Sequence, residues 1–167
     1  MSNTITAIKW RAQNPNTIHD MAMGLSPTPT INPCIGEDEI VEAEKALCFK
    51  LPQLLKDILM QIGNGGFGPG YGLYQLQTMV HIYLEYINNN RMNWKKSLLP
   101  TLTWGCRYES SIDCLSEEGQ VYFTEIIEYN ENNSSPIQIE TKTQTQSFEK
   151  FMKDWAYGVN LWDEIMG

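Results

Sequence analysis

Histidines are scarce in this chain of 167 residues, and its cysteines form no metal-binding motif. It contains two histidines, His19 and His81, and four unevenly spaced cysteines. No C-x-x-C or H-x-x-x-H pair occurs, so the ligand spacings of zinc sites are missing. A G-x-S-x-G nucleophile motif is also absent, and two histidines allow few catalytic triads. We therefore expect no metal, no cofactor and no catalytic residues.

Carboxylate pairs are the one catalytic arrangement that the residue types leave open. The chain has twenty acidic residues, enough to place two carboxyl groups about 5–9 Å apart in many folds. Nothing in the sequence singles out one such pair. The composition therefore favours a protein that binds a partner over an enzyme.

Long apolar runs are absent, and so is an N-terminal basic stretch followed by an apolar one. The first absence argues against a membrane-spanning helix and the second against a secretory signal. Without secretion the four cysteines are expected to stay reduced, because the cytoplasm disfavours disulfides. We predict a cytoplasmic protein that has no membrane partner.

One long segment lacks basic residues altogether. The chain has a net charge of -8, and residues 108–141 contain no lysine or arginine. The same segment holds eight acidic residues: Glu109, Asp113, Glu117, Glu118, Glu125, Glu128, Glu131 and Glu140. A segment of one charge sign argues against nucleic acid as a partner and favours a basic protein. Acidity alone is equally compatible with a solvated face that only keeps the protein in solution.

The stretch GNGGFGPGYG, residues 63–72, contains the pattern G-x-G-x-x-G. In a dinucleotide-binding fold this pattern follows a strand and opens a helix, whose N-terminus meets the pyrophosphate. Here it follows an amphipathic helix predicted over residues 54–62, and no Lys-Ser or Lys-Thr completes a phosphate-binding loop. We interpret the segment as a structural turn, with nucleotide binding as the alternative. The residues assigned to this turn are Asn64, Gly65, Gly66, Gly68 and Gly70.

The spacing of apolar residues predicts helices over 37–47, 54–62 and 78–90, and one C-terminal amphipathic helix that begins after Ser147. Between them lie LLPTLTWGC, SSIDCLSEEGQVYFTEIIEY and PIQIET, whose β-branched and aromatic residues are typical of antiparallel strands. We predict an α+β fold in which an antiparallel sheet in the C-terminal half packs with N-terminal helices and a C-terminal helix. The cluster SPTPTINP separates an N-terminal extension, residues 1–34, from a single domain, residues 35–167.

These segments, taken in order, resemble the SUKH superfamily. The stretch IGEDEIVEAEKALCFKLPQLLKDILMQIGNGGFGPGYGL is similar to its N-terminal signature of an acidic helix, a Leu-Pro link, a second helix and an Asn-Gly-Gly turn. LPTLTWGC and SSIDCLSEEGQV are similar to a WGCG…C-D-C…G-V segment of one bacterial branch. The resemblance covers residues 35–165. Arg107 and Glu109 depart from the pattern of that branch, and the extension before Cys34 is not shared.

The resemblance implies a non-enzymatic α+β binding domain, because the superfamily includes the fungal Smi/Knr cell-wall-assembly regulators and bacterial immunity proteins. The bacterial members commonly neutralise a toxin, often a nuclease, and the basic cleft of a nuclease would attract an acidic face. We hypothesise an immunity protein that binds a basic toxin. The alternative is a regulatory or scaffold module without a toxin partner. The residues expected on the binding face are Glu109, Asp113, Glu117, Glu118, Tyr122, Glu128 and Tyr129.

Overall fold

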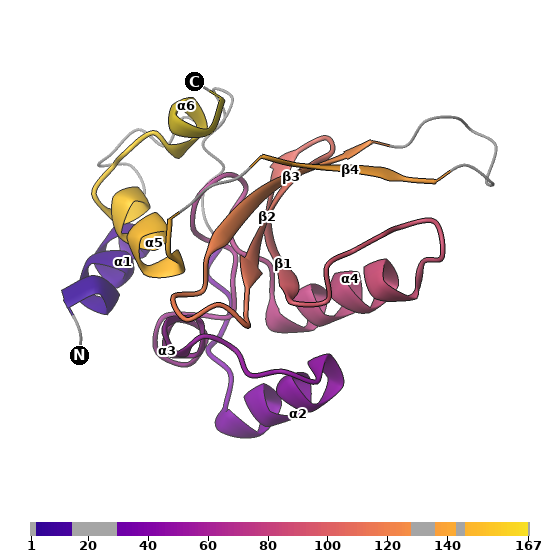
Figure 1. Cartoon of the computed structure of the whole chain (residues 1–167). Coiled ribbons are helices and arrows are strands. Elements are labelled where there is room, and N and C mark those ends of the chain that lie inside the picture. Colours follow the sequence, from indigo (N-terminus) through magenta and orange to yellow (C-terminus); the bar gives the residue numbers. More distant parts are fainter. Residues whose placement is uncertain (1–2, 15–29, 128–135, 143–145, 167) are drawn as a thin grey trace.

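The computed structural model describes residues 3–14, 30–127, 136–142 and 146–166. In this part of the chain six helices accompany one four-stranded antiparallel sheet, which confirms the predicted α+β class (Figure 1). The elements in chain order are α1 (Asn3–Gln13), α2 (Glu37–Leu47), α3 (Gln53–Gln61), α4 (Leu76–Asn88), β1 (Leu98–Gly105), β2 (Tyr108–Asp113), β3 (Val121–Ile127), β4 (Gln138–Lys142), α5 (Phe148–Ala156) and α6 (Leu161–Met166).

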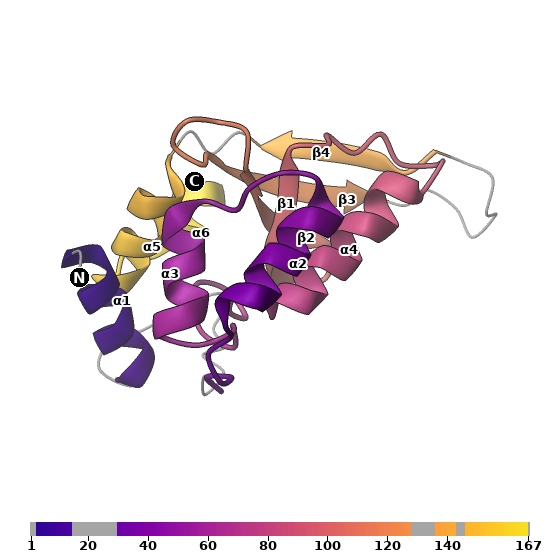
Figure 2. The same cartoon turned by 90° about the horizontal axis from the view of Figure 1, so that it is seen from below.

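The helices before the sheet form where apolar residues recur every three or four positions. α2 has the predicted bounds, and it buries Ile40, Ala43 and Leu47 while three acids occupy its first turn. α3 begins directly after Pro52, where the missing N–H of proline does no harm. α4 begins two residues earlier than predicted, and α2 lies along it (Figure 2).

The C-terminal segment forms two helices where the sequence predicted one. Ser147 caps α5 as expected, because its hydroxyl accepts a hydrogen bond from the Lys150 N–H. Gly158 then adopts a φ of 82°, a left-handed conformation that interrupts a right-handed helix. After this break the chain starts α6, and the Trp162 ring centroid lies 5.7 Å from that of Trp104 in β1.

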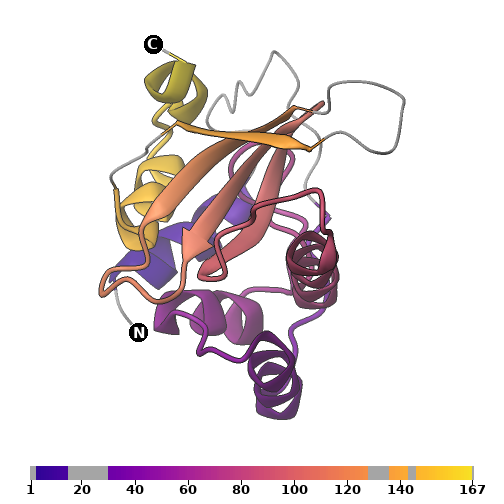
Figure 3. The same cartoon turned by 45° about the vertical axis from the view of Figure 1, so that its right-hand side comes forward.

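The sheet is a meander in which each strand pairs with the next, in the order β1-β2-β3-β4 (Figure 3). Paired residues on neighbouring strands share a face of the sheet. One face carries Phe123, whose ring packs against Trp162 of α6. The other face carries Glu109, whose carboxylate contacts Tyr86 of α4. Five of the six residues of β2 are buried, since both faces are covered.

The N-terminal extension contains a helix that packs onto the rest of the protein. α1 lies beside α5 in both views (Figures 1 and 2). Ile5, Ile8 and Ala12 of α1 are buried, and the Arg11 guanidinium lies 5.5 Å from the Trp155 ring centroid, within cation–π range. α1 therefore contributes to the hydrophobic core at the end of the molecule that lies away from α4.

The glycine-rich segment folds back on itself and lies against the edge of β1. The Gly66 N–H donates to the Leu73 carbonyl at 2.8 Å, and the Tyr74 N–H donates to the Thr101 carbonyl of β1 at 2.8 Å. The side chain of Asn64 accepts a hydrogen bond from the N–H of Leu76, the first residue of α4, at 2.8 Å. The polar groups of this segment therefore bond other parts of the chain.

Candidate functional site

The acidic segment does not form the single exposed face that its sequence suggested. Three of its carboxylates are buried, with exposed fractions of 9%, 6% and 8%: Glu109, Asp113 and Glu125. Three others are exposed: Glu117, Glu118 and Glu140. Two acids of the segment, Glu128 and Glu131, lie outside the described residues, and so does the predicted binding residue Tyr129. Burial and pairing, which the sequence did not reveal, thus divide the segment into internal and external carboxylates.

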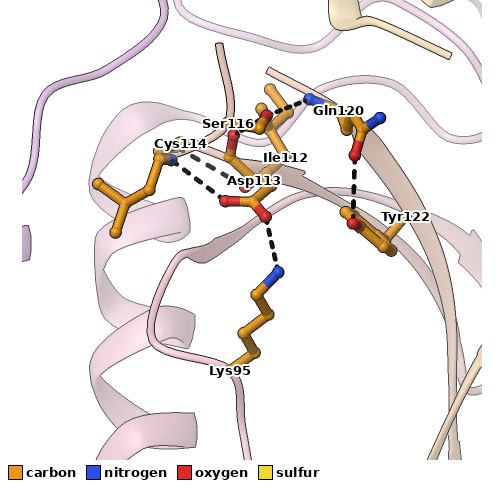
Figure 4. A network of polar contacts seen from close by, with 8 residues as sticks. Lys95, Ile112, Asp113, Cys114, Ser116, Gln120 and Tyr122 are labelled. Carbon is orange, nitrogen blue, oxygen red and sulfur yellow. Dashed lines mark hydrogen bonds and ion pairs between the residues drawn. The ribbon is translucent and has the colours of Figure 1, made fainter. Parts of the chain in front are cut away.

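Asp113 organises the turn between β2 and β3 (Figure 4). Its main-chain oxygen accepts a hydrogen bond from Ser116 Oγ at 2.8 Å, and Ser116 Oγ accepts one from the Gln120 N–H at 2.8 Å. Its carboxylate accepts from the Leu115 N–H at 3.1 Å and from Lys95 Nζ at 2.7 Å. The turn is therefore held in one conformation by bonds within the chain.

Lys95 connects this turn to β3. Its ammonium lies 5.3 Å from the Tyr122 ring centroid, within cation–π range. The Tyr122 hydroxyl in turn donates to Gln120 Oε1 at 3.3 Å. Tyr122, predicted as a binding residue, is half-buried and engaged in these internal contacts. Sequence patterns gave no sign of Lys95, because it lies 18 residues from its partner Asp113.

Asp113→Asn is expected to lower the free energy of unfolding at pH 7 by about 1–3 kcal/mol, the cost of losing charge-assisted hydrogen bonds. Burial alone would raise the pKa of the Asp113 carboxyl, but the bonds from Lys95 and the Leu115 N–H outweigh it and hold the pKa below its ordinary value. A depressed pKa stabilises the fold above the pKa of the unfolded chain, about 3.9, and that contribution is lost as pH falls through the folded value.

Urea unfolding at pH 7 and at about pH 2.5 tests this expectation, since the difference between wild type and variant must shrink in acid. The matched control is Glu118→Gln, which removes an exposed carboxylate from the same turn and is expected to change stability little. A difference that is equally large at both pH values contradicts the assigned role of the charge.

A groove of about 560 Å³ lies beside the β2–β3 turn. We call it the turn groove; it is bounded by the N-terminal ends of α3 and α5 and by residues of the turn itself. The Phe148 N–H of α5 donates to the Gly119 carbonyl at 2.9 Å, which ties the turn to that helix. The charged side chains that line the groove are Lys50, Glu117, Glu118 and Glu149.

Two carboxylates of the turn groove are exposed and have no internal partner. Glu117 and Glu118 make no hydrogen bond or ion pair with any other residue in the part of the chain that the structure describes. Glu149, by contrast, accepts a hydrogen bond from Thr4 Oγ1 of α1 at 2.7 Å. Leu115 is 72% exposed on the same turn. A fixed turn thus presents two free negative charges next to an exposed apolar side chain.

Glu109 belongs to a different place, the opposite end of β2. Glu109 and Asp113 lie four positions apart along an extended strand, which corresponds to roughly 13 Å between their Cα atoms. Its carboxylate accepts hydrogen bonds from the Tyr74 hydroxyl at 3.2 Å and the Tyr86 hydroxyl at 3.0 Å. Burial raises the pKa of the Glu109 carboxyl, and the two hydrogen bonds offset part of that rise. The structure therefore separates two of the predicted binding residues into two sites.

Two further sequence expectations concern metals and membranes. Over the described ranges, no group of three or more His, Cys, Asp or Glu side chains is arranged to hold a metal ion. In the same ranges, no helix has the length and apolar character needed to cross a membrane.

Comparison with known proteins assigns the family. No curated protein matches the chain. The sequence model of the SMI1 / KNR4 family (SUKH-1) matches residues 34–154, a range that contains α2, α3, α4, all four strands and most of α5, while α1 and α6 lie outside it. Because this match spans well over half of the sequence, the chain belongs to the SMI1 / KNR4 family (SUKH-1).

Proposed function

We propose that this protein is a non-enzymatic bacterial immunity protein that binds and neutralises a basic toxin in the cytoplasm, with the turn groove as its main contact surface. Membership of the SMI1 / KNR4 family supports a binding domain of this kind. The choice of immunity over other roles rests on the resemblance to bacterial immunity proteins and on the charge of the chain, -8.

The observation that carries the proposal is the state of Glu117 and Glu118. Both are exposed, and both lack an internal partner within the described residues. They stand on a turn that Asp113 and Ser116 already hold in place, so little conformational entropy is lost when a partner binds. The buried acids Asp113 and Glu125 form ion pairs with Lys95 and Arg107. Neither they nor the buried Glu109 line this groove.

A basic toxin matches this surface electrostatically. Complementary charges accelerate association and fix the orientation of the partners. If the toxin is a nuclease, its basic cleft binds phosphates, and an acidic turn seated there would exclude the substrate. The exposed side chain of Leu115 would supply apolar contact area beside the two charges.

The second candidate is a regulatory or scaffold module of the Smi/Knr type that has no toxin partner. The family assignment supports this candidate as well, since the family description itself names SMI1 and KNR4. Genomic context separates the two proposals: an immunity gene is expected immediately downstream of a toxin gene, whereas a scaffold gene is not.

Replacement of both free carboxylates, Glu117→Lys with Glu118→Lys, is expected to weaken binding of the basic partner at least about tenfold. The measurement is affinity capture of the tagged protein from its own host at low and at physiological salt, followed by identification of partners by mass spectrometry. Binding that depends on these charges must also weaken as the salt concentration rises.

The matched control, Glu42→Lys with Glu85→Lys, changes the net charge by the same amount at exposed positions on α2 and α4. Capture of a basic, toxin-like protein by wild type and control but not by the turn variant supports the proposal. Equal capture by both variants refutes the turn groove as the contact surface, and capture of cell-wall or signalling proteins instead favours the scaffold.

A further inference from the structure

A second cavity lies at the end of the β1–β2 hairpin, away from the turn groove. It has a volume of about 440 Å³, and its lining comes from α4, the hairpin and β3. We call it the Glu109 pocket; its lining residues are Tyr86, Cys106, Arg107, Glu109 and Ile126. This volume lies near the lower end of the range of ligand pockets, about 300 to 1,000 Å³. The pocket therefore has room for one long side chain but not for a long segment.

The carboxylate in this pocket retains hydrogen-bonding capacity. The Tyr74 and Tyr86 hydroxyls each donate to one oxygen of Glu109. Burial and the nearby Glu109 charge raise the pKa of both phenols, which therefore stay protonated as donors. An ionised carboxylate offers about four acceptor sites, so roughly two remain for a ligand.

Glu109 also lacks a counter-charge. It is 9% exposed, and no lysine or arginine in the described part of the chain forms an ion pair with it. The nearest cation along the hairpin, Arg107, is engaged elsewhere: its Nε lies 2.7 Å from Glu125 Oε1. Carboxylates this buried are normally paired with a positive charge. The pocket therefore has a place for one cation.

A second polar group next to Glu109 is also unused. Thr124 of β3 lies directly opposite Glu109 in the strand pairing, so the two side chains share a face of the sheet. Thr124 is fully buried, and its Oγ1 has no hydrogen-bond partner among the described residues. Thr124 does not line the Glu109 pocket, so its hydroxyl adds to the polar character of the sheet face beside Glu109 without contacting a ligand in the pocket.

From these observations we infer that the Glu109 pocket binds the side chain of one arginine or lysine of the partner protein. The inference rests on the proposed function only for the source of that side chain, the basic partner. The incoming cation neutralises Glu109 and bonds its free lone pairs, while Arg107 stays paired with Glu125. The partner would thus contact the protein at two places, the turn groove after the C-terminal end of β2 and the Glu109 pocket near its N-terminal end.

The pocket can be tested without the partner by titrating N-acetyl-arginine N-methylamide into isotope-labelled protein and recording NMR spectra. We expect saturable, roughly millimolar binding that shifts the Ile126 methyl signals and the Cys106 and Arg107 amide signals. N-acetyl-citrulline N-methylamide has the same shape without the charge and is expected to cause no saturable shift.

Two substitutions have opposite expected effects on this binding. Glu109→Gln removes the negative charge and is expected to weaken binding at least about tenfold. Arg107→Gln removes the competing cation and is expected to strengthen it about threefold, because like charges repel. The matched control Glu42→Gln neutralises an exposed carboxylate on α2 and is expected to leave binding unchanged.

Thermal unfolding of each variant shows whether a loss of binding is caused by misfolding. If Glu109→Gln does not fold, Ile126→Trp tests the pocket instead, since it fills the cavity and leaves the carboxylate in place; binding must then be lost. Equal shifts with the arginine and citrulline compounds, or unchanged binding in Glu109→Gln and Ile126→Trp, refute the pocket.

The two proposals fail in different ways. If the arginine compound binds but no basic protein is captured from the host, the pocket is established and the immunity proposal fails. If a basic partner is captured through Glu117 and Glu118 but the arginine compound does not bind, the immunity proposal is supported and the pocket is refuted.

Discussion

Gly66→Ala is expected to lower the free energy of unfolding by about 2–5 kcal/mol, and two effects add to this figure. Gly66 has a φ of +86°, and a left-handed backbone costs an alanine about 1–2 kcal/mol. A Cβ at this position would also lie 1.8 Å from the Thr30 carbonyl oxygen, so the main chain must move, which costs about 1–3 kcal/mol.

Urea unfolding followed by circular dichroism measures this loss. Gly36→Ala is the matched control, because its φ is -90° and the nearest atom to an added Cβ is 3.9 Å away. Its expected cost as an N-cap replacement is about 1 kcal/mol or less. A Gly66→Ala protein that is as stable as the control would mean that the segment shifts without penalty, and the structural role of this glycine would be refuted.

Variants of the same glycine-rich segment also test whether it binds a nucleotide. If the glycines bind phosphate, a nucleotide must raise the thermal stability of the wild-type protein. Variants of Gly65 or Gly68 must then stay folded but lose this stabilisation. Geometry points to the structural use, because Gly66 bonds Leu73 and Tyr74 bonds β1. A thermal shift of wild type with ATP or NAD, abolished in a folded Gly68 variant, would support the nucleotide-binding alternative.

The helices α2, α3 and α4 were the most predictable part of this fold, because each depends on residues close together in the sequence, whereas α1 was not predicted. α2 has the predicted bounds, since its acids and its apolar positions lie within eleven residues. The break before α6 was not predicted. It depends on Gly158 taking a left-handed conformation, while the residues around it continue a helical apolar spacing.

The carboxylates of β2 were the least predictable part of the candidate site. Alternation along β2 places Glu109, Ser111 and Asp113 on one polar face, which from sequence reads as exposed to solvent. In the structure this face is covered, because the Tyr86 hydroxyl and the Lys95 ammonium supply donors to its acids. Those partners lie 23 and 18 residues away in the sequence, so no local pattern could reveal them.

The exposed acids Glu117 and Glu118 were easier to place. They lie in a short polar turn between two apolar strands, and such turns are normally exposed. The position of these two residues in the sequence therefore agrees with their exposure in the structure, whereas their role in binding stays a prediction. What the sequence could not supply was the groove beside them, which requires the ends of α3 and α5 to meet at the same turn.

Trp104→Ala is expected to lower the free energy of unfolding by about 4–6 kcal/mol. Trp104 is 2% exposed, and its ring centroid lies 6.5 Å from that of Phe151 in α5. Truncating such a side chain leaves a cavity that costs about 3–5 kcal/mol. The indole N–H also donates to Ser110 Oγ at 2.8 Å, so the buried hydroxyl of Ser110 loses its donor, which costs about 1 kcal/mol or more.

Two variants separate these contributions. Trp104→Phe keeps most of the packing but loses the N–H, so it is expected to cost less than the alanine. Trp10→Ala is the control for the loss of an indole at a surface position, because Trp10 is 51% exposed. If Trp104→Ala and Trp10→Ala lower the free energy of unfolding by similar amounts, the central position of Trp104 in the core is contradicted.

The contact between Trp104 and Trp162 shows whether α6 is an integral part of the fold or a loosely attached end. In a double-mutant cycle the pair is expected to couple by about 0.5–1.5 kcal/mol, the range for packed aromatic rings. Trp104 and Trp10 make no ring contact with each other in the described part of the chain, so this pair should be additive within about 0.5 kcal/mol. Additivity of Trp104 and Trp162 would mean that α6 detaches without disturbing the core, although their centroids lie 5.7 Å apart. Coupling would instead make α6, which lies outside the family match, part of the cooperative unit.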